Sequence, residues 1–192
     1  MTQYNTIRAI SVSLAFLMLG ACTTIPVDER DQIREEVNQI TESTIEQLVS
    51  DDPSIQTALD TATGYAVASV SATKIPIVGG GYGLALLHDL QNGTRNYMNF
   101  TRLDLGAGIG TGRFSVLVIF ENRETLEKFR DGSWQSIIAA QSALGTQGST
   151  VTREGDGYSL HFVSDAGVAL AASARLLKTS INEDLTDTGV SE

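Results

Sequence analysis

The pattern of apolar and polar residues divides the chain into a short apolar start, a polar helical stretch and a long β-rich part. In residues 28–50, spacings of four, three, four and four separate the members of a sparse apolar stripe, and these spacings predict a helix. Asp51, Asp52 and Pro53 end that helix; Asp52 as N-cap and Pro53 at the first helical position predict a second, short helix. The stripe consists of Ile33, Val37, Ile40, Thr44 and Leu48.

From Tyr65 onward, the pattern changes to strands separated by turn residues. The pair Asn92-Gly93 is typical of a tight hairpin turn, and the run 114–120 is apolar without alternation, which predicts burial on both faces of a sheet. Strands are predicted over residues 65–70, 84–87, 97–105, 114–120, 158–163 and 168–177.

A short helix interrupts these strands. Asn122 is a suitable N-cap, with Leu126 and Phe129 on the inward side, whereas residues 133–144 fit a helix or a strand equally well. The polar tail from residue 182 is expected to fray. The order of elements predicts an α+β fold: N-terminal helices, then a mostly antiparallel, glycine-rich twisted sheet or barrel-like sandwich with a short inserted helix.

Glycine recurs at every second position in two of the β-rich stretches. Alternate residues of a strand share one face, so each stretch presents a face without side chains, against which another backbone is expected to pack closely. A groove for a lipid chain is the alternative interpretation. Neither stretch has the lysine of a phosphate-binding loop or the following helix of a dinucleotide site. The glycines are Gly79, Gly81 and Gly83, and then Gly106, Gly108, Gly110 and Gly112.

The first residues have the features of an export signal. Arg8 is the only charged side chain before Cys22, and the apolar run 10–19 would reach roughly 15 Å as a helix, half the thickness of a bilayer core. A run this short predicts a signal peptide rather than a membrane span. The alternatives are an ordinary signal peptide with a chance cysteine, or a buried apolar segment.

The end of this run, Leu19-Gly20-Ala21-Cys22, resembles the bacterial lipoprotein box. The resemblance implies cleavage before Cys22 and attachment of lipid to its thiol, the only cysteine of the chain. Thr23 then favours the outer membrane, because an aspartate after the cysteine would favour retention at the inner membrane. The expected organisation is a signal peptide (1–21), a lipid-anchored tether with a helix (22–50) and a globular domain (51–192).

The net charge of the mature chain limits the classes of partner that it can bind. The mature chain would have 171 residues, 12 of them basic and 23 acidic, and therefore a net charge of −11. A protein this acidic is poorly suited to nucleic acid, and its overall field opposes anionic lipid unless its bases cluster.

Several of the glycine-rich segments together resemble the SYLF domain. They are residues 64–67 (Gly-Tyr-Ala-Val), Lys74, residues 77–83 (Ile-Val-Gly-Gly-Gly-Tyr-Gly), the glycines from 106 to 112, and Val116 to Ile119. The resemblance extends over roughly residues 53–184 and implies a domain that binds membrane phospholipid without catalytic activity.

The sequence offers no catalytic constellation, no metal-ligand spacing and no cofactor motif, so no enzyme is predicted. Four bases near the glycine strands are candidates for lipid binding if they meet on one face; scattered solvated charges are the alternative. We therefore expect a non-enzymatic, lipid-anchored envelope protein that binds phospholipid. The alternative is a module in which the acidic helix 28–50 binds an envelope protein or the cell wall. The four bases are Lys74, Arg95, Arg102 and Arg113.

Overall fold

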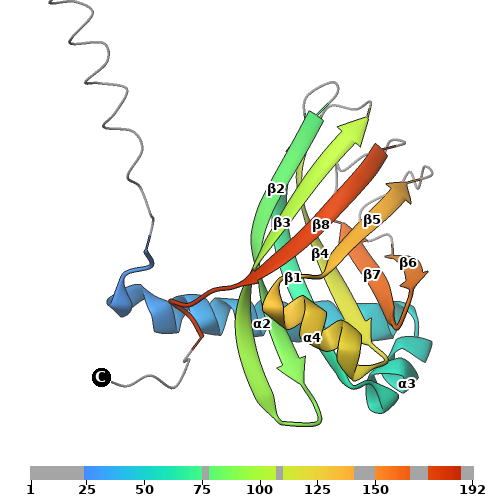
Figure 1. Cartoon of the computed structure of the whole chain (residues 1–192), viewed down its shortest axis with the longest axis horizontal. Coiled ribbons are helices and arrows are strands. Elements are labelled where there is room, and N and C mark those ends of the chain that lie inside the picture. The colour runs from blue at the N-terminus through green and yellow to red at the C-terminus, as the bar shows by residue number, and fades with distance from the viewer. Residues whose placement is uncertain (1–23, 75–77, 107–109, 141–149, 165–172, 187–192) are drawn as a thin grey trace, which may run out of the picture.

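The structure, a computed structural model, describes residues 24–74, 78–106, 110–140, 150–164 and 173–186. These residues form the predicted α+β fold, with three helices and one antiparallel sheet of eight strands (Figure 1). The helices are α2 (Val27–Asp51), α3 (Ser54–Thr61) and α4 (Arg123–Asp131). The strands are β1 (Gly64–Lys74), β2 (Val78–Asp89), β3 (Thr94–Gly106), β4 (Gly110–Phe120), β5 (Gln135–Ala140), β6 (Thr150–Gly155), β7 (Tyr158–Ser164) and β8 (Ser173–Ile181).

The sheet is curved and open. Its strand order is β5-β8-β3-β2-β1-β4-β7-β6, so the four longest strands lie at its centre and the six-residue strands β5 and β6 form its edges. Of the ambiguous stretch 133–144, residues 135–140 form strand β5 and residues 141–144 lie outside the described residues, whereas β6 was not predicted from the sequence. Helices α2 and α3 cover one face, which we call the outer face, and α4 covers the other, the inner face.

The inner face carries the larger hydrophobic core. Helix α4 begins as predicted at Asn122, whose side chain accepts a hydrogen bond from the backbone N–H of Thr125 at 2.9 Å. The helix buries Leu126 and Phe129 completely, and the Phe129 ring packs against Trp134 with a centroid distance of 5.2 Å. Facing them are alternate strand residues, among them Ala66, Ala68, Val70, Leu87, Met98, Phe100, Val116 and Val118.

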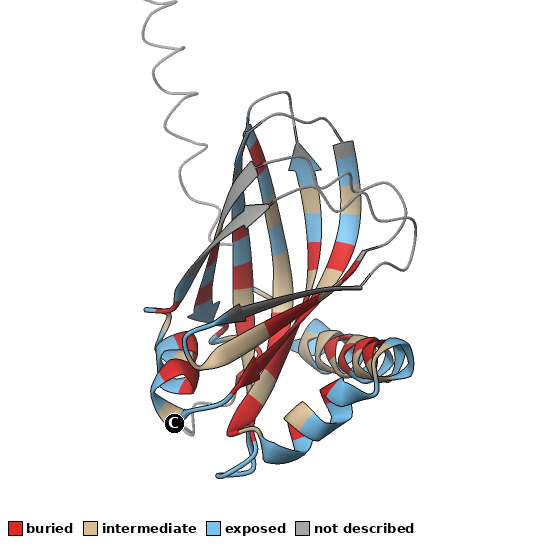
Figure 2. Cartoon of the chain, turned by 90° about the vertical axis from the view of Figure 1, so that its right-hand side faces the viewer, coloured by how far each residue is buried: buried red, intermediate tan, exposed pale blue. Residues whose placement is uncertain are grey.

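The outer face buries a smaller core beneath α2 and α3. Leu48 and Ile55 of these helices pack on Leu117 and Ile119 of β4. Because β4 contributes to both cores, residues 116–120 are all buried, as the unbroken apolar run predicts. Figure 2 shows buried residues concentrated where the helices cover the sheet, with more exposed residues toward the far ends of the long strands.

The glycines of β2 lie where neighbouring backbone approaches closely. A Cβ atom on Gly83 would lie 1.8 Å from the carbonyl oxygen of Ser69, and one on Gly81 would lie 2.9 Å from that of Ser71. Close packing of neighbouring backbone is therefore confirmed at these two positions. Gly108, at the centre of the second glycine stretch, lies outside the described residues.

The expectation that the chain frays from residue 182 is wrong for residues 182–186. Leu185 is only 1% exposed, and the Asp184 carboxylate accepts hydrogen bonds from the Ile25 backbone N–H at 2.9 Å and from the Arg30 guanidinium at 2.8 Å. Arg34 donates to the carbonyl oxygen of Leu185 at 2.8 Å. These contacts fasten the start of α2 to the segment after β8, and we call them the terminal clamp.

Candidate functional site

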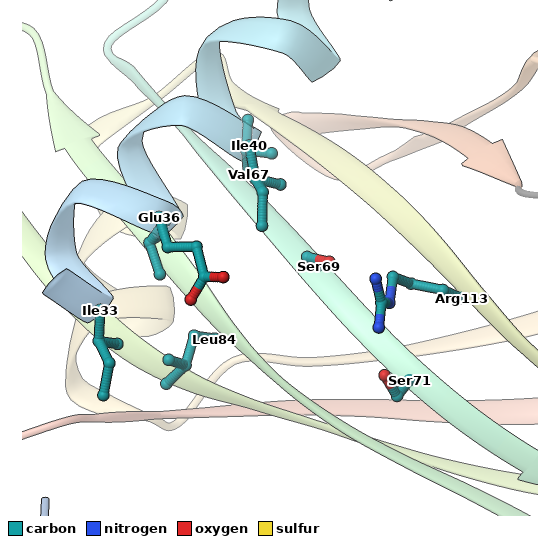
Figure 3. A pocket seen from close by; sticks show the side chains of 9 residues that line it. Ile33, Glu36, Ile40, Val67, Ser69, Ser71, Leu84 and Arg113 are labelled. Atoms are coloured by element: carbon teal, nitrogen blue, oxygen red, sulfur yellow. The ribbon is translucent and has the colours of Figure 1, made fainter. Parts of the chain in front are cut away.

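A hollow of about 240 Å³ lies between α2 and the outer face of the sheet, and we call it the helix groove (Figure 3). Helix α2 forms one wall, and strands β1, β2 and β4 form the floor and the other wall. Its lining consists of Ile33, Glu36, Val37, Ile40, Val67, Ser69, Ser71, Leu84 and Arg113.

The local sequence explains why a hollow forms here. The predicted stripe of α2 faces the sheet, so Ile33, Val37 and Ile40 form the apolar wall. Outward-facing positions of β1 alternate, and after the large Val67 they carry the small side chains of Ser69 and Ser71. The helix therefore packs tightly near its C-terminal end and leaves space above the two serines.

Two opposite charges enter the helix groove from opposite walls. Figure 3 shows the Glu36 carboxylate extending from α2 and the Arg113 guanidinium extending from β4, with Ser69 between them. Both charged residues are exposed, and no ion pair or hydrogen bond joins either of them to another described residue. The site thus combines an apolar wall with a cation and an anion that are available to a ligand.

A wider hollow of about 750 Å³ adjoins the helix groove, because Ile33 and Leu84 line both. Its walls include Thr24, the first described residue, and Tyr82 of β2. The chain therefore enters the described structure on the outer face, two residues after the predicted lipid-bearing Cys22. Cys22 itself lies outside the described residues.

The four predicted lipid-binding bases are not brought together on one surface. Arg102 is buried on the inner face, with its guanidinium 4.7 Å from the centre of the Phe114 ring. Arg113 and Arg95 are exposed on the outer face, and Arg95 does not line the helix groove. Lys74 is described by its backbone alone, at the end of β1, where it pairs with Gly79 and Gly110.

Exposed apolar side chains gather at one end of the β2–β3 hairpin, and sequence reasoning missed them. Val78 pairs with Leu105, and Leu103 pairs with Gly80, which carries no side chain. Tyr82 follows on the same face of β2; the exposed fractions of Tyr82 and Leu105 are 58% and 54%. We call Val78, Tyr82, Leu103 and Leu105 the strand-end patch. The signal was the alternation of strand 97–105, in which Met98 and Phe100 occupy one face and Leu103 and Leu105 the other.

The two histidines lie in different surroundings, and neither belongs to a group of metal-binding residues in the described part of the chain. His88 is half-buried beside the Tyr65 hydroxyl at 3.1 Å, and His161 is buried with its Nε2 atom 3.0 Å from the Ser159 hydroxyl. Burial lowers the pKa of both imidazoles. Within the described ranges, no cluster of three His, Cys, Asp or Glu is arranged to hold a metal ion.

No helix among the described residues is both long enough and apolar enough to cross a bilayer.

Comparison with known proteins gives a distant relative. No family model matches the chain. The chain is 24% identical over 159 residues to a protein named beta cell expansion factor A from Aeromonas veronii. The alignment covers 82% of this chain and 60% of the relative, so the chain spans about three-fifths of that protein's length.

Proposed function

We propose that this protein is a non-enzymatic, lipid-anchored envelope protein whose domain docks on a phospholipid bilayer through the strand-end patch. The observation that carries the proposal is the exposure of four neighbouring apolar side chains on the face where the chain enters the domain. The lipoprotein box at Cys22 and the resemblance to SYLF domains support the same function. We assign the anchor to the outer membrane and the domain to the periplasm, because a threonine rather than an aspartate follows the cysteine.

The patch and the anchor fit one membrane surface. Thr24 and Tyr82 line the same hollow, so acyl chains on Cys22 would start close to the base of the patch. Fully burying an apolar side chain is worth about 1.5–3 kcal/mol, so a partly inserted patch supplies several kcal/mol at most. That energy is too small for durable binding alone, but it is sufficient for a domain that an anchor already holds at the surface.

Electrostatic attraction contributes little to this docking. The candidate lipid-binding arginines lie on both the inner and the outer face of the sheet. The Arg102 guanidinium is buried over an aromatic ring. The mature chain keeps a net charge of −11, which opposes an anionic surface. The apolar side chains therefore provide the docking energy, and we expect domain docking to persist when ionic strength rises from 0.1 M to 1 M.

An environment-sensitive fluorophore tests the docking surface in the anchored protein. Because the thiol of Cys22 would be acylated, Leu103→Cys provides a single reactive thiol in the full chain reconstituted into vesicles. A label at 103 is expected to emit at shorter wavelength and to be quenched by brominated lipid. In the matched control, Gln91→Cys at the opposite end of the hairpin, the same label should emit as it does in water and should not be quenched by brominated lipid.

Equal exposure of both labels to water would contradict membrane docking and favour the alternative, in which the domain reaches an envelope protein or the cell wall. The anchor is tested separately. Cys22→Ser should remove lipid modification and lipoprotein-type cleavage, measured by the mass of the protein recovered from membranes. Acylated protein recovered from that variant would contradict the anchor.

A further inference from the structure

We infer that the helix groove binds the headgroup of an ethanolamine phospholipid, with the phosphate on Arg113, the ammonium on Glu36 and the first acyl methylenes on the apolar wall of α2. The inference deepens the proposed function by naming a lipid and a site for it. It concerns residues outside the strand-end patch, so the two proposals can fail separately.

The phosphate site rests on Arg113. Its guanidinium lines the groove next to the hydroxyl-bearing residue Ser71 and has no ion pair or hydrogen bond to another described residue. A planar guanidinium with several N–H donors matches the oxygens of a phosphate and binds them in pairs. Arg102, by contrast, already packs over the Phe114 ring in the inner core and is not accessible in this way.

The ammonium site rests on Glu36. A lone cation in the groove would suit any anionic lipid, but an exposed carboxylate on the opposite wall repels a second negative charge. A primary ammonium instead supplies three hydrogen-bond donors, which the Glu36 carboxylate and the Ser69 hydroxyl accept. The pair of charges therefore selects a zwitterion over phosphatidylglycerol, which has the phosphate without the ammonium.

The apolar wall accounts for the lipid tail. Ile33, Val37 and Ile40 line one side of the groove and Leu84 lines the other, so a water-soluble zwitterion would leave this surface in contact with solvent. Ile33 and Leu84 continue into the wider hollow beside Tyr82, at the edge of the strand-end patch. A lipid in the groove can therefore extend its chains toward the docked bilayer.

Native mass spectrometry of the detergent-solubilised full chain tests the assignment by counting bound lipid after addition of short-chain phosphatidylethanolamine, phosphatidylglycerol or glycerophosphoethanolamine. The ethanolamine lipid is expected to bind about tenfold more than phosphatidylglycerol, since one charged hydrogen bond separates them. Arg113→Gln should reduce binding of both lipids about tenfold. Glu36→Gln should reduce binding of the ethanolamine lipid alone and remove the preference.

Arg95→Gln and Glu46→Gln are matched controls, because both residues are exposed, lie on β3 and α2, and do not line the groove. Equal binding of both phospholipids, or equal losses in the control variants, would overturn the inference. Glycerophosphoethanolamine bound as tightly as the lipid would assign the groove to a water-soluble zwitterion and overturn it as well. The fluorophore experiment at residue 103 reports the proposed function independently of all these outcomes.

Discussion

The two ends of the β2–β3 hairpin are built from the same strands, but only at one end do the side chains find partners within the protein. At the turn end, the buried Asp89 carboxylate accepts hydrogen bonds from the backbone N–H groups of Gln91 and Asn92 and from the Arg123 guanidinium. At the opposite end, Val78 pairs with Leu105, and both side chains remain exposed. One end of the hairpin is closed by polar contacts within the protein, and the other presents apolar surface to its surroundings.

This difference indicates a division of labour between the two ends. Hydrogen bonds to a buried carboxylate stabilise the turn end, because an unpaired charge there would be costly. Exposed leucines contribute little to folding, so the far end can retain them for binding a partner. Substitutions at the turn end should therefore lower stability, and substitutions in the strand-end patch should lower membrane docking.

The largest expected effect is at the turn end. Asp89→Ala removes the acceptor of the Arg123 guanidinium and of two turn N–H groups, and we expect the free energy of unfolding to fall by about 3 kcal/mol. Arg123 is partly exposed, which places the loss at the low end for a broken buried pair. Denaturant titration measures it. Asp28→Asn, at an exposed site, is the control. Equal free energies of unfolding for the two variants would show that the Asp89 contacts do not stabilise the turn end.

Between the two ends, Gly83 of β2 should tolerate no side chain, because the backbone of β1 lies close to it. Gly83→Ala would place a Cβ atom 1.8 Å from the Ser69 carbonyl oxygen, and we expect a loss of about 2 kcal/mol by overpacking. Gly80→Ala, three residues away, would meet only a carbonyl oxygen at 3.7 Å and should change stability by less than about 0.5 kcal/mol. Similar melting temperatures for the two variants would contradict close packing at Gly83.

Acid should weaken the turn end selectively. Hydrogen bonds from Arg123 hold the pKa of Asp89 at about 2, below its ordinary value of 3.8. Because the folded-state pKa is depressed, the stabilisation is complete above pH 3.8 and is lost as pH falls through about 2. The depressed pKa of Asp89 corresponds to about 2 kcal/mol of folding free energy when the carboxylate is fully ionised. Between pH 5 and pH 2, Asp89→Asn should lose less stability than the natural chain; parallel pH curves would contradict this.

The smallest change in stability is expected at the strand-end patch. Leu103→Ser together with Leu105→Ser should alter the free energy of unfolding by less than about 0.5 kcal/mol, because both side chains are exposed. The same pair should reduce lipid quenching of a fluorophore at residue 78 several-fold. Leu90→Ser, which removes an exposed leucine at the turn end, should leave that quenching unchanged. Unaltered quenching in the double variant would show that the patch does not hold the domain on the membrane.

Local patterns predicted most of the elements, because their signals are contained in short segments. The stripe of α2, the Asn122 cap and the apolar run of β4 each specify structure through neighbours within a few residues. Strand β6 was missed because Thr150 to Gly155 is polar and becomes a strand only by pairing with β7. The terminal clamp was missed for a similar reason, because the ion pair between Asp184 and Arg30 joins residues that are far apart in the sequence.

The candidate site was predictable only in part. Arg113 was identified as a lipid-binding candidate from its position near the glycine strands, but its opposite charge, Glu36, lies on a helix distant in sequence. Register decides that Arg102 faces the inner core while Arg113 faces the groove, and a shift of one residue in either strand would turn its arginine to the opposite face. Such relations between faces require the assembled sheet.

The terminal clamp also determines how mechanical load enters the domain. A pull on the chain ahead of Thr24 passes through the Ile25 N–H and the Arg30 guanidinium to Asp184, and from there to the end of β8. Helix α2 is thus held at its N-terminal end rather than peeled from the sheet one turn at a time. A force applied through the proposed anchor at Cys22 would be borne first by these two contacts of Asp184 and by the central sheet behind them.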